Sequence, residues 1–217
     1  MKSLTAALVG AVMAAPLMAA PTASHAEAVV PAPSGVYVVD PTHANVLFQV
    51  SHLGLAPYTA RFDTVDATLT LDVDNPANSS VTASVDVGSV STNYQGSKPF
   101  DQTLAFGPKF FNGNEFPKIT FTSTGIEQTG DKTATITGDL EMLGVTKPIT
   151  LAAELTGALG NHPFAPGNPP AVGFTAEGVI DRTDWNFTHL TNALPGGALA
   201  VGTEVRILIQ AEFIKGE

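Results

Sequence analysis

The chain contains no cysteine, so no disulfide can stabilise it. It is also poor in charge: charged residues make up 14% of its 217 residues, and acidic residues outnumber basic ones by 20 to 10. Because an acidic protein repels phosphate backbones at long range, this balance argues against nucleic acid as a partner. Hydrophobic residues make up 44% of the chain, which is enough for a packed core, and that core must supply the stability.

Motifs for catalysis and metal binding are missing as well. The chain has no Gly-x-Ser-x-Gly elbow, no His-Glu-x-x-His pair, no phosphate-binding glycine loop and no dinucleotide fingerprint. His43, His52, His162 and His189 are not spaced as zinc ligands are. A glycosidase needs two carboxylates facing one enclosed space, and Asp63 is a single candidate. The sequence therefore predicts no enzyme, no metal site and no cofactor.

Residues 1–26 are typical of a secretory signal peptide. Lys2 gives the positive start, Leu4–Met18 is apolar and rich in alanine, and Ser24-His25-Ala26 is a small-x-small cleavage site. The apolar run is short for a membrane anchor. Cleavage after Ala26 predicts a secreted chain, in which residues 27–35 form an extended, proline-containing tether.

The rest of the chain, residues 36–217, predicts a single all-β domain. From Val65 to Val73 every second residue is apolar, and the residues between are polar. Successive side chains of a strand point to opposite faces, so this period of two indicates one dry and one wet face. Most later segments repeat the pattern, and short turns join them. The pattern favours eight or nine antiparallel strands in a sandwich or a barrel.

Irregular segments interrupt the alternation. Asp40-Pro41 predicts a turn between a strand at Tyr37–Val39 and another at Ala44–His52. Helical turns that could plug one end of the sheet are expected at Pro99–Phe106 and Pro108–Phe111. The Gly- and Pro-rich stretch Gly157–Ala171 predicts a loop.

Small residues at inward positions leave room inside such a fold. They are Ala67, Ala83, Ala134, Gly138, Ala153, Ala176, Gly178 and Ala211. An eight-stranded barrel has an interior that side chains just fill, or that holds one small ligand where those side chains are small. A solid core remains the competing interpretation, because large aromatic side chains fill most β-domains.

Three polar residues share the inward parity. His52 is either a core imidazole that is hydrogen-bonded to a neighbouring segment or a polar contact for the headgroup of a ligand. Arg61 and Asp63 favour a solvated ion pair at a strand end.

Five sets of residues, in order, resemble the motifs of the YceI-like family. They are Tyr37–His43 with Phe48–Gly54, Asp101–Leu104 with Phe110-Phe111, Phe116–Ser123, Gly138–Leu140 with Gly144–Pro148, and Asp181–Trp185. The resemblance covers nearly all of residues 36–217. The chain departs from the family pattern at Thr103, Leu143 and Asn186, where His, Arg and Gly are usual, and at Ala60 and Ala67, which are often Gly.

The resemblance implies a lipocalin-like barrel of eight antiparallel strands, with short helical turns near one end, in the bacterial periplasm. It also implies a long apolar ligand inside the barrel, such as a polyisoprenoid, an isoprenoid quinone or a similar amphiphile. The candidate ligand-binding residues are Phe48, His52, Phe62, Leu104, Phe106, Phe110, Phe111, Phe121, Met142, Phe174 and Trp185. The helical turns around Phe106–Phe111 and the loop Gly157–Ala171 are expected to border the mouth of the barrel.

A carrier or store is the function that this reading favours, and two alternatives stay open. One is a periplasmic enzyme that uses the loop residues Asp181, Arg182, Asp184 and His189, although Asp181 and Arg182 also fit a structural pair that orders the loop. The other is an interaction module with a solid core and no ligand. Transient membrane contact and dimerisation are open as well.

Overall fold

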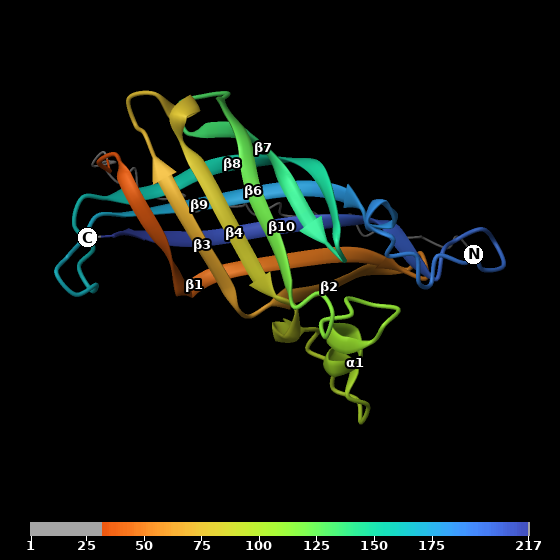
Figure 1. Cartoon of the computed structure of the whole chain (residues 1–217). Helices are drawn as coiled ribbons and strands as arrows, with labels where there is room; N and C mark the ends of the chain where they lie inside the picture. Colours follow the sequence, from red (N-terminus) through yellow and green to blue (C-terminus); the bar gives the residue numbers. More distant parts are fainter. Residues whose placement is uncertain (1–31, 217) are drawn as a thin grey trace, which may run out of the picture.

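The computed structural model describes residues 32–216, which form a closed, antiparallel β-barrel with one short helix (Figure 1). The predicted signal peptide and residues 27–31 of the predicted tether lie outside the described residues. The strands are β1 Gly35–His52, β2 Ala56–Phe62, β3 Val65–Leu71, β4 Ser80–Asp86, β5 Val90–Ser91, β6 Lys118–Gln128, β7 Thr133–Met142, β8 Val145–Leu159, β9 Ala171–Asp181 and β10 Val201–Lys215. The helix is α1 Phe100–Phe106, and the 3-10 turns are η1 Pro76–Asn78, η2 Val87–Ser89 and η3 Arg182–Trp185.

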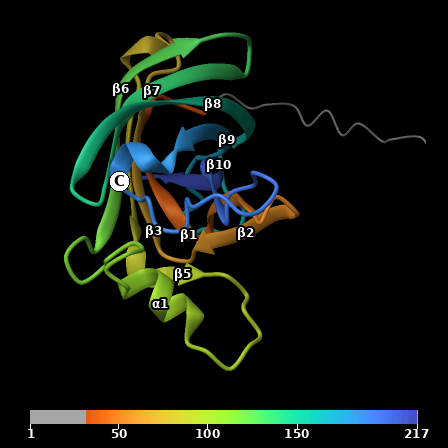
Figure 2. The same cartoon turned by 90° about the vertical axis from the view of Figure 1, so that its right-hand side faces the viewer.

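Eight strands close the ring in the order β1-β3-β4-β6-β7-β8-β9-β10, and β10 pairs back with β1. β1 is long enough to pair with two strands along one of its edges. Its first residues pair with β3, and its last residues pair with β2. The sheet therefore splits between β2 and β3, and β5 adds to the free edge of β2. α1 lies outside the ring at this split end, next to β5 and η2 (Figure 2). The predicted eight-stranded lipocalin-like barrel, with helical turns near one end, is confirmed.

The predicted turn at Asp40-Pro41 is wrong, because β1 runs straight through these residues. A bulge takes its place: the register with β10 shifts between Val39 and Ala44. The bulge changes the parity, so Val39 and then Val46 both line the interior. On the outer side, Asp40 accepts hydrogen bonds from the Thr42 hydroxyl and His43 Nδ1, and these bonds lower the pKa of Asp40 to about 2.

A second change of parity occurs between β2 and β3. Phe62 points inward, whereas Arg61 and Asp63 are about half exposed and form an ion pair, with Arg61 Nε 2.7 Å from Asp63 Oδ1. The predicted solvated ion pair is confirmed. The inward parity assigned to Arg61 and Asp63 is wrong, because the chain between the two strands restarts the alternation.

Buried side chains form two larger clusters at the two ends of the barrel, and a smaller one on β8 and β9 that consists of Leu151, Ala153 and Ala176. One cluster, which includes Phe62, Phe111 and Trp185, lies at the α1 end. The other lies at the opposite end and includes Ala32 and Tyr37, whose hydroxyl donates to the Pro33 carbonyl at 2.6 Å. The last residues of the predicted tether are thus packed against the barrel. No helix among residues 32–216 is long and apolar enough to cross a membrane.

Candidate functional site: a tunnel along the barrel

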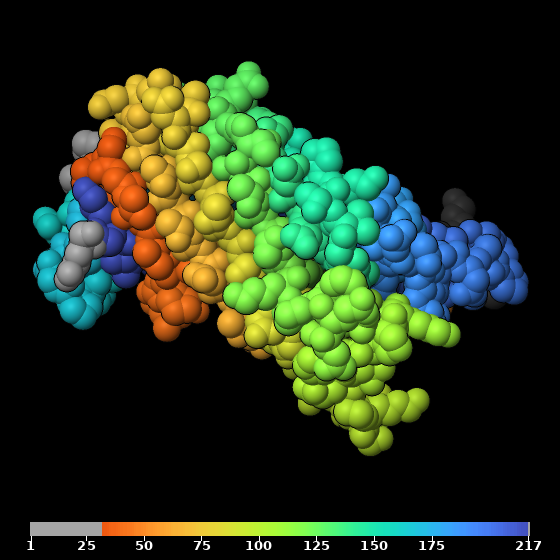
Figure 3. All heavy atoms as spheres, viewed as in Figure 1, coloured from red at the N-terminus to blue at the C-terminus, as the bar shows by residue number. Residues whose placement is uncertain are grey.

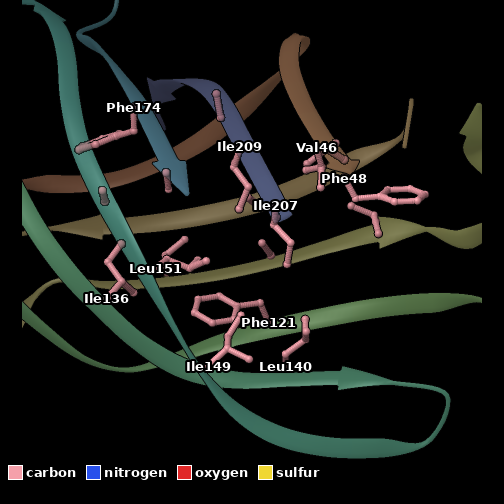
Figure 4. Close-up of a pocket in the computed structure, with 18 of the residues that line it drawn as sticks. Val46, Phe48, Phe121, Ile136, Leu140, Ile149, Leu151, Phe174, Ile207 and Ile209 are labelled. Carbon is pink, nitrogen blue, oxygen red and sulfur yellow. The ribbon is translucent and has the colours of Figure 1, made fainter. Parts of the chain in front are cut away.

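The barrel encloses a cavity of about 920 Å³. This volume lies near the upper end of the range of about 300–1,000 Å³ that is usual for small-molecule sites. In Figure 4, Phe121, Leu151 and Ile207 extend from different strands into one shared space. The prediction that small inward residues leave room inside the barrel is confirmed, and the competing interpretation, a solid core, is wrong.

The cavity is a tunnel that follows the strands from one end of the barrel to the other. On β3 and just beyond it, every second residue from Val65 to Val73 lines the cavity, and on β10 the same is true from Val205 to Phe213. At about 3.3 Å per residue, each row is roughly 26 Å long. A straight apolar chain fits such a space better than a compact ligand does.

Alanines set the width of the tunnel along one wall. Ala134, Ala153 and Ala176 are register partners on β7, β8 and β9, and all three line the cavity. Ala67, Ala83 and Ala211 also line it, on other strands. These six alanines occupy the inward positions that the alternation predicts for them.

Gly138 and Gly178 widen the tunnel in a different way. A Cβ atom on Gly138 would lie 2.4 Å from the Phe121 ring, and one on Gly178 would lie 2.6 Å from Leu151 Cδ2. Phe121 and Leu151 therefore occupy the space above the two glycines. Their bulk stays against the wall because the glycines have no side chain.

Nine of the eleven candidate ligand-binding residues line the cavity: Phe48, His52, Phe62, Leu104, Phe110, Phe111, Phe121, Met142 and Phe174. Trp185 and Phe106 lie outside its lining, which corrects their assignment. Trp185 is 2% exposed, and its Nε1 donates to the Leu140 carbonyl at 3.1 Å, so it anchors η3 to β7. Phe106 packs beneath the barrel beside Gly88 and Gly113. Phe106 lies in α1 and Trp185 in η3, outside the strands, where a period of two does not indicate the face.

Aromatic rings line the α1 end of the tunnel. The Phe111 ring packs against Phe48, Phe62 and Phe187, with centroid distances of 6.0, 5.5 and 5.2 Å. Phe110 meets His189 edge to face at 4.9 Å. The helical segment therefore borders the tunnel, as predicted. The loop between β8 and β9 lies at the opposite end of the barrel, so the expectation that it borders the same mouth is wrong (Figure 1).

His52 lies at the rim of the tunnel. It is exposed, and its ring lies 6.3 Å from that of Tyr58. The interpretation of His52 as a core imidazole is therefore wrong, because a core histidine would be buried. His52 instead lines the cavity and is exposed to solvent.

The rim at the opposite end is charged. Asp72, Asp131 and Lys132 border the cavity there. The backbone N–H of Asn75 and the side-chain amide of Asn78 donate to Asp72, and these hydrogen bonds lower the pKa of its carboxyl group. Asp72 therefore keeps its negative charge at neutral pH.

Arg182 holds the long segment between β9 and β10 in place. Its guanidinium is buried and donates to the carbonyls of Phe187, Val201 and Gly202 at 2.6, 3.1 and 2.7 Å. Burial lowers the pKa of Arg182. The predicted pair with Asp181 is wrong, because Asp181 instead accepts from the N–H of Thr183, and hydrogen bonds from Thr183 lower the pKa of Asp181. The ordering role that was predicted for the pair belongs to Arg182.

The loop residues of the enzyme alternative do not converge. Asp181 and Asp184 are exposed, Arg182 is engaged with three carbonyls, and His189 packs on Phe110. Within residues 32–216, no group of three or more His, Asp or Glu side chains could hold a metal ion.

Residues 37–213 match the model of the YceI-like domain. The chain belongs to the YceI-like family. Protein YceI of Salmonella arizonae and that of Salmonella paratyphi B are each 38% identical to it over 173 residues, which cover 80% of this chain and 82% of the relative. The family resemblance read from the sequence motifs is confirmed.

Three solved structures share the fold. BcnA of Burkholderia cenocepacia has a TM-score of 0.64 at 20% identity and covers 80% of this chain and 98% of its own. The YceI protein of Campylobacter jejuni has a TM-score of 0.63 at 24% identity, with coverages of 77% and 90%. A polyisoprenoid binding domain from Saccharophagus degradans, implicated in plant cell wall breakdown, has a TM-score of 0.60 at 15% identity, with coverages of 83% and 98%.

Three of the five positions at which the chain departs from the usual YceI-like motifs lie outside the tunnel lining, whereas Ala60 and Ala67 line it. Asn186 replaces the usual glycine at a φ of 61°, and asparagine tolerates this left-handed conformation better than most residues. Leu143 lies in the turn between β7 and β8, and the Thr103 hydroxyl donates to the Pro99 carbonyl within α1. None of these three residues lines the cavity.

Several residues that line the tunnel in this YceI-like barrel were missed from the sequence. They are Tyr58, Tyr94, Phe100, Phe187 and Leu190. Four of them lie outside regular strands, so no alternation could assign them a face. The one signal available was the concentration of aromatic residues in the segment around α1 and in the segment between β9 and β10.

Proposed function

We propose that this protein binds the long apolar chain of a polyisoprenoid or an isoprenoid quinone inside its barrel and carries it through the periplasm. The observation that carries the proposal is the apolar tunnel, which is lined from end to end by alternate residues of β3 and β10. The name of the Saccharophagus degradans domain, which has the same fold, supports this ligand class. The signal-peptide pattern of residues 1–26 supports the periplasm.

The apolar lining of the tunnel fits a carrier that recognises its ligand by shape. At about 0.8 kcal/mol for each buried methylene, a chain of some tens of carbons transferred from water would exceed the ceiling of known affinities. The relevant competitor is therefore the bilayer, which is as apolar as the tunnel. Exchange between the two is close to neutral in free energy, so the barrel can load and unload its ligand.

Extraction of the native protein tests this function. The protein is purified from periplasm without detergent, extracted with organic solvent and analysed by mass spectrometry. We expect an isoprenoid chain that co-purifies with the folded protein and that delipidated protein takes up again from detergent micelles. An extract without lipid, together with no uptake by delipidated protein, would contradict the proposal.

A further inference from the structure

Two segments at one end of the barrel carry no acidic residue, lysine or arginine. Residues 46–60 and residues 186–203 contain no Asp, Glu, Lys or Arg, although the chain as a whole has 20 acidic and 10 basic residues. They form the β1–β2 hairpin and most of the connection between β9 and β10. Charge is therefore absent from a whole region of the fold, and not only from one turn.

The two segments lie side by side. His52 is the register partner of Val201, and the Leu53 N–H donates to the Ala200 carbonyl at 3.0 Å. A Cβ atom on Gly54 would lie 3.0 Å from that of Ala198. Residues 51–58 and 188–202 together form one surface, the apolar tip. The blue segment after β9, which supplies half of the tip, projects at one end of the molecule (Figure 3).

The apolar tip presents leucines to solvent. Leu55 is 82% exposed, and Leu53 and Leu190 are 38% and 39% exposed. Leu53 and Leu190 also have φ angles of 56° and 62°, in the left-handed region that leucine rarely adopts. Such a conformation persists only where the surrounding structure imposes it.

The tip is continuous with the tunnel. His52, Tyr58, Leu190 and Val201 belong to the tip and also line the cavity. Exposed residues line the cavity at the opposite end too, but there the rim carries Asp72, Asp131 and Lys132. An apolar chain that enters between the leucines of the tip passes one charged side chain, Arg182, whose guanidinium is buried and already donates to three backbone carbonyls. At the other end, the chain would have to displace the water around three charged side chains.

We propose that the apolar tip docks on a lipid bilayer and is the entrance through which the apolar chain passes between bilayer and tunnel. This inference rests on the proposed function, because the bilayer is where such a ligand resides. Binding to the bilayer interface strengthens with the apolar area that is buried there, and the exposed leucines of the tip supply such area. A protein partner is the weaker fit, because protein interfaces have a polar rim, whereas the two segments of the tip contain no Asp, Glu, Lys or Arg.

The variant Leu53→Asp/Leu55→Asp tests the proposal. Neither leucine lines the cavity, so the tunnel is unchanged. The matched control is Phe164→Asp, which removes an aromatic side chain that is 91% exposed on the β8–β9 loop, at the opposite end of the barrel. Both variants exchange exposed apolar surface for negative charge: the first adds two charges at the tip, and the control adds one at the opposite end of the barrel.

Two readouts use vesicles of phosphatidylethanolamine and phosphatidylglycerol. With ligand-free vesicles, the parent and Phe164→Asp are expected to co-float, and Leu53→Asp/Leu55→Asp is not. With vesicles that contain a fluorescent polyprenol, the double variant should extract the probe roughly tenfold more slowly than the parent does. Uptake of the same polyprenol from detergent micelles should be equal for all three proteins.

The outcomes separate the two proposals. Equal flotation and equal extraction by all three proteins would overturn docking at the tip, as would equal losses in both variants. Extraction by the parent that requires an added periplasmic protein fraction would also overturn it, in favour of a protein partner. Flotation that depends on the tip, without uptake of polyprenol from vesicles or micelles, would support docking and overturn the proposed function.

Discussion

Replacing Ala153 and Ala176 together with phenylalanine is expected to weaken polyisoprenoid binding by roughly a hundredfold or more, because the two rings would obstruct the tunnel. The two alanines are register partners on β8 and β9, and both line the cavity. The added rings occupy cavity space rather than an already packed core, so the stability should be kept or slightly increased. Uptake of a fluorescent polyprenol from detergent measures the effect, and thermal unfolding checks the fold.

Ala152→Phe provides the matched control for this variant. Ala152 is the preceding residue on β8, but it is exposed on the outer face of the barrel. We expect this variant to bind polyprenol as the parent does. Undiminished binding by a folded Ala153→Phe/Ala176→Phe protein would mean that the ligand does not lie in the tunnel.

Replacing Arg182 with methionine is expected to lower the free energy of unfolding by about 3–5 kcal/mol. Methionine retains apolar contact with the surroundings but leaves the carbonyls of Phe187, Val201 and Gly202 without their charged donor. The guanidinium also lies 5.2 Å from the centre of the Phe187 ring, and this contact is lost too. Urea unfolding measures the change.

Arg206→Met separates the effect of the Arg182 contacts from that of losing an arginine. Arg206 is 72% exposed, and its Nε lies 3.7 Å from Glu204 Oε1, an arrangement that contributes little to stability. We expect the unfolding free energy of this variant to change by less than about 0.5 kcal/mol. If the two variants lost equal stability, Arg182 would not be the residue that orders the segment after β9.

Most of the barrel wall could be predicted from the sequence, because alternation is a local signal. The inward side chains between Val65 and Val73 follow from a period of two, and so do the alanines that set the width of the tunnel. The same logic failed at Asp40-Pro41, where a bulge changes the parity without ending the strand. A proline at that position fits a bulge as well as it fits a turn.

The ends of the barrel could not be predicted in the same way. Trp185 and Phe106 are aromatic, as a ligand site requires, but both lie outside the strands, in η3 and α1. Their contacts depend on segments that are distant in sequence. Which loops share an end depends on the closure between β1 and β10, which no local pattern encodes. For this reason, Leu190 and the β8–β9 loop were placed only by the structure.

A crystal structure of the protein loaded with a polyprenol tests the central claim most directly. The account predicts continuous density along the barrel axis, in contact with Phe121, Leu151 and Ile207, and the position of the polar end of the ligand would identify the entrance. Density for the ligand only outside the barrel, or rotation of these three side chains to close the tunnel, would contradict it.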